Sequence, residues 1–236
     1  MSVISLFKIK ELPKKLDLVY RIDGRKRDKY SFMARPSKYN ENEIEIMVWY
    51  KEDVETGLKR AFSDEASKII SIFKENGREQ VLRKVFAFVN LENSTLEIYR
   101  GIDNITIELK DILQDFLKTD LTSVSLNSGQ LLKIIQTHSN ELKQAMFKYI
   151  HGLWYHIIRG THLENNNKYK TYLETKQDSL RVISVLPKIK YINGNEYMVT
   201  INGDRGTIRM SNGYVKWKPR AEIRQIVSLV DSVFSF

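Results

Sequence analysis

The sequence contains no cysteine among its 236 residues. This absence excludes disulfides, thiolate zinc sites, iron–sulfur clusters and cysteine nucleophiles. No apolar run approaches the roughly 20 residues that a membrane-spanning helix needs. The first apolar stretch is too short for a secretory signal and is not followed by a small-residue cleavage site. We therefore expect a cytoplasmic protein with no membrane partner.

Catalytic motifs are also missing. The sequence has no glycine-rich phosphate loop, no nucleophile elbow and no HExxH motif. Triplets of the form Glu-x-Lys begin at Glu108 and Glu174 and fit the loose pattern of metal-dependent nucleases. In a chain with 28% charged residues such triplets are common by chance. We expect no cofactor, no metal site and no enzymatic activity.

The histidines leave one catalytic alternative open. The chain has four of them, His138, His151, His156 and His162. His156 or His162 could act as general base or acid in metal-independent RNA cleavage. A partly exposed structural role is the simpler interpretation of both side chains.

Positive charge is plentiful and lies toward the two ends of the chain. Thirty-eight Lys/Arg oppose 29 Asp/Glu, which gives a net charge of +9 and a pI near 9.5. Residues 1–60 hold 14 basic and 10 acidic residues, whereas residues 61–120 hold 8 and 11. The basic excess returns in 121–180 (7 against 4) and in 181–236 (9 against 4). Local fields of this kind favour RNA or DNA as partner, with an acidic protein surface as the alternative.

Two basic clusters are the candidate nucleic-acid-binding residues. The first is expected at a hairpin tip and comprises Arg25, Lys26, Arg27 and Lys29. The second belongs to the C-terminal strands and the start of the last helix: Lys188, Lys190, Arg205, Arg209, Lys216, Trp217, Lys218 and Arg220. Basic side chains can follow phosphates, and aromatics beside them can stack on bases or ribose. The alternative is a solvated edge that blocks sheet-to-sheet aggregation.

The pattern of residues 1–127 predicts an N-terminal β-hairpin followed by a ferredoxin-like α+β domain. Apolar residues suggest strands at 3–9 and 30–34, and the alternation over 16–22 suggests another strand. Further along, the order strand (43–50), helix (53–75), strands (83–90 and 94–101), helix (106–117) and strand (122–126) gives a βαββαβ unit.

The rest of the chain divides into two predicted parts. The apolar stripe over 128–159 predicts helices, so we assign residues 128–163 to a helical connector. Residues 164–236 contain three Asn-Gly dipeptides between short apolar runs, which indicates a basic antiparallel meander. A helix is expected from Pro219 onward.

Residues 84–91 (KVFAFVNL) are similar to a signature strand of RNA-recognition modules. The early glycine and the final aromatic residue of that signature are missing here. In the module, aromatics at the positions of Phe86 and Phe88 would stack on bases. Ordinary packing of both rings in the core, beneath the helices, is the favoured interpretation.

The whole architecture resembles a known family. A basic hairpin (16–34), an α/β core, a helical connector and linker-like strands (182–218) are similar to the separate N–L1–L2 (APAZ-like) subunits that accompany short prokaryotic Argonautes. The resemblance implies a non-catalytic subunit that clamps a guide–target duplex in host defence, in a heterodimer with a larger partner. A second resemblance, to CRISPR repeat-processing endoribonucleases, lacks that family's glycine-rich C-terminal loop. A structural adaptor for an acidic protein is the remaining alternative.

Overall fold

A computed structural model describes residues 2–62, 66–150, 152–191, 194, 196–211 and 220–234. Within these residues the protein is a mixed α+β fold with one large antiparallel sheet and seven α-helices. The strands are β1 (Ser2–Ile9), β2 (Lys26–Arg27), β3 (Tyr30–Pro36), β4 (Glu43–Asp53), β5 (Gln80–Asn90), β6 (Thr95–Ile98), β7 (Leu121–Ser123), β8 (Ser139–Ile150), β9 (Leu153–Arg159), β10 (Leu180–Pro187), β11 (Met198–Asn202) and β12 (Thr207–Ser211).

The helices are α1 (Lys15–Ile22), α2 (Val54–Phe62), α3 (Ala66–Glu75), α4 (Asn104–Leu117), α5 (Ser128–His138), α6 (Asn167–Lys176) and α7 (Arg220–Phe234). Short 3₁₀ turns, η2 (Leu163–Asn165) and η3 (Gln177–Ser179), flank α6. No helix in the described part of the chain is long and apolar enough to cross a membrane.

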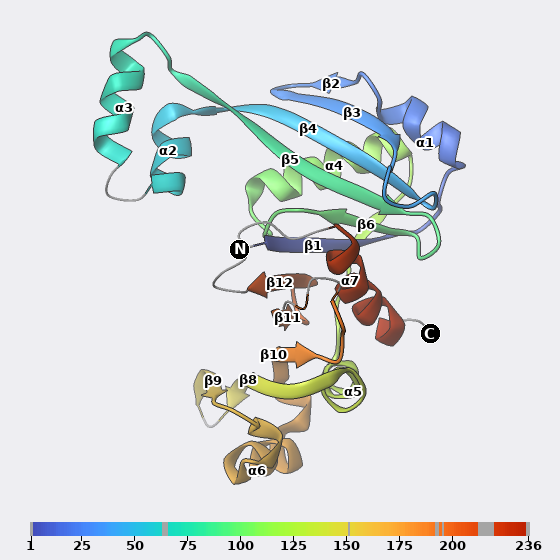
Figure 1. Cartoon of the computed structure of the whole chain (residues 1–236), viewed down its shortest axis with the longest axis vertical. Coiled ribbons are helices and arrows are strands. Elements are labelled where there is room, and N and C mark those ends of the chain that lie inside the picture. Colours follow the sequence, from blue (N-terminus) through green and yellow to red (C-terminus); the bar gives the residue numbers. More distant parts are fainter. Residues whose placement is uncertain are drawn as a thin grey trace.

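The sheet runs continuously through the molecule in the order β2-β3-β4-β5-β6-β1-β12-β11-β10-β8-β9, and β7 also pairs with β1. The N-terminal strand β1 therefore lies at the centre, antiparallel to β6 on one side and to β12 on the other. Two long strands, β4 and β5, form a ribbon that carries α2 and α3 at its far end, away from the body (Figure 1).

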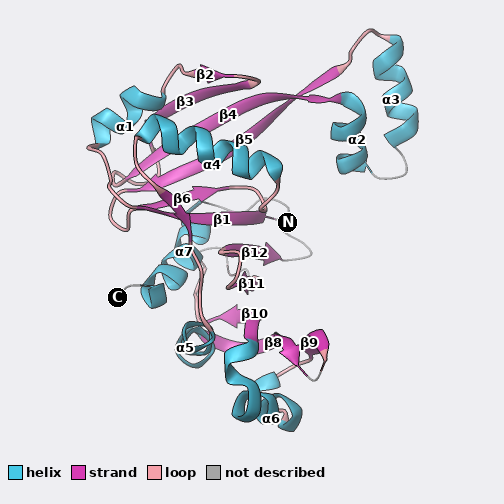
Figure 2. Ribbon diagram, turned by 180° about the vertical axis from the view of Figure 1, so that it is seen from behind, coloured by secondary structure: helices cyan, strands magenta, loops and turns pink. Residues whose placement is uncertain are grey.

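Two large hydrophobic cores lie on the sheet, one in each half, and a small third cluster joins α2 and α3 at the end of the β4–β5 ribbon. In the first, α1 and α4 cover one face of β3–β6, as the view from behind shows (Figure 2). In the second, α5 and α7 pack with β8 and β10–β12. Side chains of β1 enter both cores, because Ile4 and Leu6 point to one face and Phe7 and Ile9 to the other. The alternation of a strand explains this division.

Most of the predicted elements are confirmed as elements of the same type. The final helix is present as α7, and the single helix expected over 53–75 is divided into α2 and α3. The first strand of the predicted meander is present as β10, followed by β11 and β12, but the strand expected at 214–218 lies outside the described residues. Helix α4 begins at Asn104, because Asp103 is its N-cap and accepts a hydrogen bond from the backbone N–H of Thr106 at 2.9 Å.

The strand predicted at 16–22 is wrong, since these residues form α1. Leu18 and Ile22 are four residues apart and both are buried, whereas Leu16 and Tyr20 are 78% and 80% exposed. Helical spacing therefore decides which side chains enter the core. The basic hairpin forms one segment later, between β2 and β3.

The helical connector predicted over 128–163 is correct only for α5. Residues 139–159 form the hairpin β8–β9, in which Phe147 and Ala145 are fully buried against the rest of the sheet. The ferredoxin-like unit is not confirmed. Strands β4 and β5 pair directly as antiparallel neighbours, so α2 and α3 are an excursion from a hairpin and not a crossover between parallel strands.

Candidate nucleic-acid interface

The face of β3, β4 and β5 that is turned away from α1 and α4 is covered at one end, over Glu43 and Phe88, by the start of α7. We call the rest of this face the open sheet face. Its register is fixed by cross-strand pairs such as Met33↔Met47, Met47↔Phe86 and Trp49↔Lys84. The residues that project from this face are Met33, Arg35, Met47, Trp49, Lys51, Leu82, Lys84 and Phe86. The opposite face of the same strands is the apolar core under α1 and α4.

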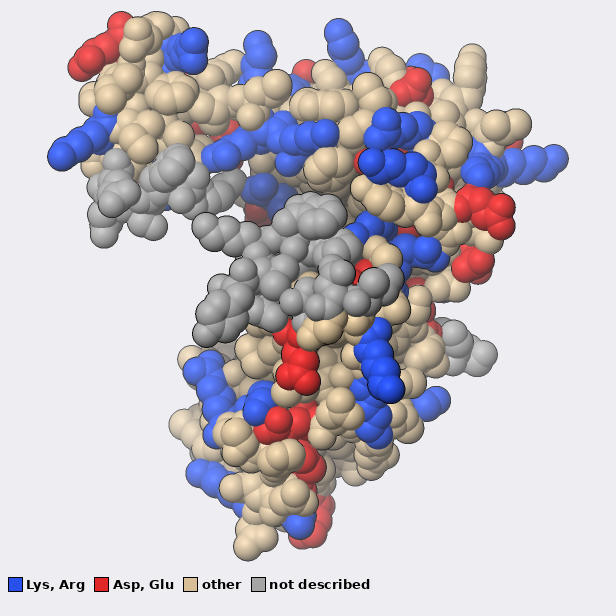
Figure 3. Space-filling model, in the orientation of Figure 1, with Lys and Arg blue, Asp and Glu red and all other residues tan. Residues whose placement is uncertain are grey.

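Basic and aromatic side chains alternate on the open sheet face. The Lys84 ammonium lies 4.4 Å from the ring centroid of Phe86 and 5.3 Å from the ring of Trp49. Lys51 is exposed and lies two residues beyond Trp49 on the same strand. Neither lysine has a carboxylate partner among the described residues. Figure 3 shows the resulting row of Lys and Arg side chains across the β4–β5 ribbon.

A buried ionic cluster anchors α7 at the edge of this face. The guanidinium of Arg220 donates hydrogen bonds to Glu97 at 2.6 and 2.8 Å and also pairs with Glu43. The same group lies 4.1 Å from the ring centroid of Phe88. Glu97 and Glu43 are 1% exposed. Burial raises the pKa of Glu97, while the positive charge of Arg220 acts in the opposite direction.

Phe86 and Phe88 lie on the same side of β5, turned away from the core under α1 and α4. The expectation that both rings face that core is therefore wrong. Phe88 is 4% exposed because Arg220 and Tyr99 pack on it, with the Tyr99 ring centroid at 5.2 Å. Phe86 is only partly buried and contacts Lys84. RNA-recognition modules have a comparable arrangement, in which helices cover one face of the sheet and aromatic side chains on the other face stack on bases.

The predicted N-terminal basic cluster is partly neutralised. Arg27 forms an ion pair with Asp115 at 2.5 Å, and Lys29 pairs with Glu108 at 3.0 Å, both on α4. The Tyr30 hydroxyl and the Lys29 ammonium hold the pKa of Glu108 below its usual range. Arg25 and Lys26 are exposed and have no carboxylate partner within the described residues.

The predicted C-terminal residues do not form one cluster. Lys188 and Lys190 are exposed beyond the end of β10, where the backbone N–H of Lys188 donates to the carbonyl of His138 at the end of α5 at 2.8 Å. Arg205 lies at the other end of these strands, in the β11–β12 turn, and Arg209 is exposed in the middle of β12. Lys216, Trp217 and Lys218 lie outside the described residues.

The prediction that Arg220 binds nucleic acid is contradicted by its burial. Its side chain is 5% exposed, and its donors are taken up by Glu43, Glu97 and Tyr99. Two acidic residues from distant strands make this site specific for a cation, so the charge of Arg220 is satisfied inside the protein.

The catalytic candidates do not assemble. His156 is partly buried with its ring 5.0 Å from that of Tyr172, and His162 is exposed with Nδ1 3.1 Å from a carboxylate oxygen of Glu164. Glu108 is engaged by Tyr30 and Lys29 as described above. Among the residues that the structure describes, no group of three His, Asp or Glu could hold a metal ion.

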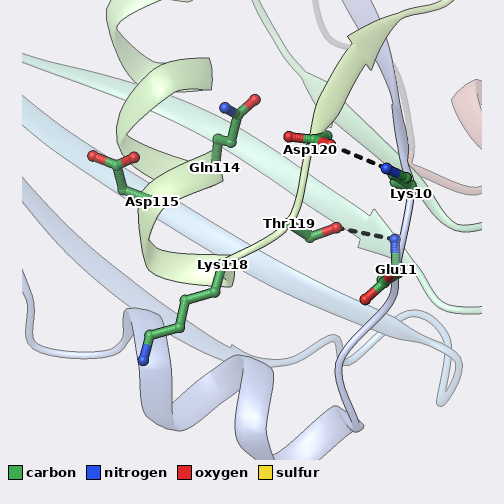
Figure 4. A pocket seen from close by; sticks show the side chains of 7 residues that line it. All are labelled: Lys10, Glu11, Gln114, Asp115, Lys118, Thr119 and Asp120. Carbon is green, nitrogen blue, oxygen red and sulfur yellow. Dashed lines mark hydrogen bonds and ion pairs between the residues drawn. The ribbon is translucent and has the colours of Figure 1, made fainter.

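A polar cleft of about 460 Å³ lies between the end of β1 and the C-terminus of α4 (Figure 4). Lys10 and Asp120 pair across it at 3.5 Å, and the backbone N–H of Glu11 donates to the Thr119 hydroxyl at 2.9 Å. The remaining lining side chains point away from one another in Figure 4. The cleft therefore lacks a set of groups that converge on a ligand.

Sequence reasoning missed Trp49 and Lys51. The alternation of Ile44, Ile46 and Val48 places the intervening residues on the opposite side of the strand. This alternation could have identified Trp49 and Lys51 as exposed candidates. No protein-family model matches the sequence, and a comparison with curated proteins likewise gives no match.

Proposed function

We propose that the chain is a non-catalytic nucleic-acid-binding subunit that works with a larger protein partner, and that the open sheet face contacts the nucleic acid. The observation that carries this proposal is the position of the Lys84 ammonium between the rings of Trp49 and Phe86, with no carboxylate partner among the described residues. A lysine without a carboxylate partner is available to a phosphate, and the two rings are available to bases.

Each group on this face has a defined part in such an interface. Lys51 and Lys84 supply the sequence-independent attraction to the phosphate backbone, which falls with salt concentration. Trp49 and Phe86 supply stacking surfaces, which tolerate every base because each has a π-face. The sheet holds these side chains in a fixed register, so no ordering of a loop is required on binding.

We infer the partner from the resemblance to N–L1–L2 subunits. The catalytic candidates among the described residues do not come together, so in this proposal the partner carries out the reaction. In that setting the chain holds a guide–target duplex, and the partner, a short Argonaute in the resembling systems, acts on it. The face then serves as a wall of the nucleic-acid channel. Only the residues of the open sheet face need to be exposed for this role.

Binding to labelled 20-nucleotide single strands and duplexes of RNA and DNA tests the proposal by fluorescence anisotropy at two salt concentrations. We expect salt-dependent binding that Lys84→Glu weakens at least tenfold and Trp49→Ala by about tenfold, in line with roughly 1–3 kcal/mol for one stacked base. Lys133→Glu on α5 is the matched control, because Lys133 is an exposed lysine far along the chain from this face.

Three results would contradict the proposal. Binding could be absent with all four nucleic acids, it could be insensitive to salt, or it could fall equally in the Lys84 and Lys133 variants. Metal-independent cleavage of the RNA, lost in His156→Ala or His162→Ala, would instead identify an endoribonuclease.

A further inference from the structure

The sheet has two outer strands, and they differ in how they are protected. At one end β2 has only two residues, Lys26 and Arg27, both exposed. Short, charged outer strands are the usual means of preventing sheets from pairing edge to edge. At the other end β9 has seven residues, LWYHIIR, of which only the last is always charged. The edge at β9 therefore lacks the protection that β2 has.

The apolar side chains of β9 are exposed on consecutive positions. Leu153, Trp154 and Tyr155 are 53%, 78% and 60% exposed, and Tyr149 across the hairpin is 72% exposed with its ring 6.1 Å from that of Trp154. Because successive side chains of a strand point to opposite faces, both faces are apolar at this edge. Exposed apolar surface of this kind marks an interaction site.

The backbone of β9 is paired along one side only. Its register with β8 runs from Gln144↔Arg159 to Ile150↔Leu153. Apart from the adjoining Gly160, whose N–H donates to the Lys143 carbonyl at 3.1 Å, no other described segment forms a backbone hydrogen bond along this hairpin edge. A row of peptide N–H and C=O groups thus faces outward over the length of the strand.

The charge around this edge is positive. Residues 139–176, which form β8, β9 and α6, contain six Lys/Arg and three Asp/Glu. Lys143 is paired with Glu141 at 2.6 Å and Lys148 with Asp204, while Glu164 accepts from the backbone N–H of Leu142. The positive charge that remains comes mainly from α6. The exposed lysines of α6 have no carboxylate partner in the described part of the chain. Figure 3 shows basic side chains along the outer side of this region.

We propose that β9 is the docking edge for the protein partner, and that it receives an extended segment in which acidic and apolar residues alternate. The segment adds a strand to the sheet: its backbone pairs with the outer side of β9, its apolar residues cover Trp154 and Tyr155, and its carboxylates meet the surrounding lysines. This inference rests on the partner included in the proposed function, and it names the surface that receives that partner.

Two other occupants fit the edge less well. A second copy of this chain would bring another positive edge against this one, which like-charge repulsion disfavours. A nucleic acid has no peptide ladder to pair with the strand, and the one permanent cation on β9, Arg159, is already held by the side-chain oxygen of Gln144 at 2.7 Å. The outward backbone row of β9, which no described segment pairs, is complementary to another peptide.

The test uses labelled ten-residue peptides and the full chain. One peptide alternates Glu with Val, a second replaces each Glu with Lys, and a third carries the Glu–Val sequence with N-methyl groups on alternate backbone nitrogens. We expect the Glu–Val peptide to bind at least tenfold more tightly than the other two. Tyr155→Lys should weaken binding of the Glu–Val peptide at least tenfold. If that variant does not fold, Trp154→Ser is tested in its place, with the same expected result.

Tyr20→Lys is the matched control, because Tyr20 is a tyrosine exposed to 80% on α1, in the other half of the molecule. Equal binding of the three peptides, or equal effects of Tyr20→Lys and Tyr155→Lys, would overturn the proposal. So would a dimer in sedimentation that Tyr155→Lys dissociates, or displacement of the peptide by single-stranded RNA. The Lys84→Glu variant should bind the peptide as tightly as the unmodified chain does. A failure of the nucleic-acid proposal would therefore appear in the nucleic-acid assay, and a failure of the docking proposal in the peptide assay.

Discussion

Replacing Arg220 with methionine removes the cation that Glu43 and Glu97 share inside the protein. Both carboxylates are 1% exposed. Among the described residues Arg220 is the one cation with a buried side chain that pairs with them, since Arg224 approaches Glu43 at 3.6 Å from a partly exposed position. Breaking a buried ion pair from one side typically costs about 3–5 kcal/mol, because a charge is left buried without a partner. For a chain of this size the loss corresponds to a fall of roughly 6–20 °C in Tm.

The same variant should show a distinctive pH dependence. A carboxyl whose folded-state pKa is raised adds stability below its unfolded-state pKa and loses this contribution as the pH rises through the folded-state pKa. Burial raises the pKa of Glu97, and Arg220 limits the rise. Without Arg220 the pKa of Glu97 rises further, so this carboxyl binds a proton more readily as the pH falls and the buried negative charge is removed. The loss of stability should therefore be smaller at pH 5 than at pH 7.5.

Urea unfolding followed by circular dichroism at both pH values measures these losses. Arg27→Met is the matched control, because Arg27 and its partner Asp115 have side chains 46% and 57% exposed, and exposed pairs contribute about 0–1 kcal/mol. A combined Arg220→Met, Glu97→Gln, Glu43→Gln variant should recover part of the stability. A loss below about 1 kcal/mol for Arg220→Met, or one that does not decrease toward acidic pH, would refute the reasoning.

Two further predictions concern single residues and use the same unfolding assay. Asp103→Ala should lower the free energy of unfolding by about 0.5–2 kcal/mol, because it removes the N-cap of α4; no loss would contradict the assigned cap. Gly206→Ala should cost distinctly more than Gly24→Ala. Both glycines have positive φ, which costs an alanine about 1–2 kcal/mol, but only at Gly206 would the new Cβ collide with a backbone carbonyl, that of Val124. Equal losses in the two glycine variants would show that the carbonyl contact is unimportant.

The sequence predicted best where local pattern and tertiary burial agree. The alternation in β4 and the apolar spacing of α4 and α7 each place the buried side chains correctly. The apolar residues of 16–22 fit both the two-residue period of a strand and the 3.6-residue period of a helix. Only the packing of Leu18 and Ile22 against the sheet selects the helix. At residues 139–150 pairing with β10, a strand more than 30 residues away in sequence, overrides the helical pattern, and residues 153–159 pair in turn with β8.

The candidate site shows the same division. Lys84 and Phe86 were recognisable from the aromatic strand, and Trp49 could have been found from the alternation of its neighbours. The burial of Arg220 could not have been found, because its acidic partners Glu43 and Glu97 lie 177 and 123 positions away in the sequence. Charge counts alone treat such a residue as exposed, and they likewise do not show that Arg27 and Lys29 are paired with α4.

The central position of β1 has a consequence for the order in which the molecule forms. The strand is synthesised before every other described strand, yet its long-range neighbours β6, β7 and β12 follow much later, and β12 begins only at Thr207. Residues 2–5, which pair with β12, must therefore wait until nearly all of the described chain has left the ribosome, whereas residues 7–9 can pair earlier with β7. During synthesis the half formed by β2–β6 can close first. The other half is completed last, by a strand and a helix that return to the beginning of the chain.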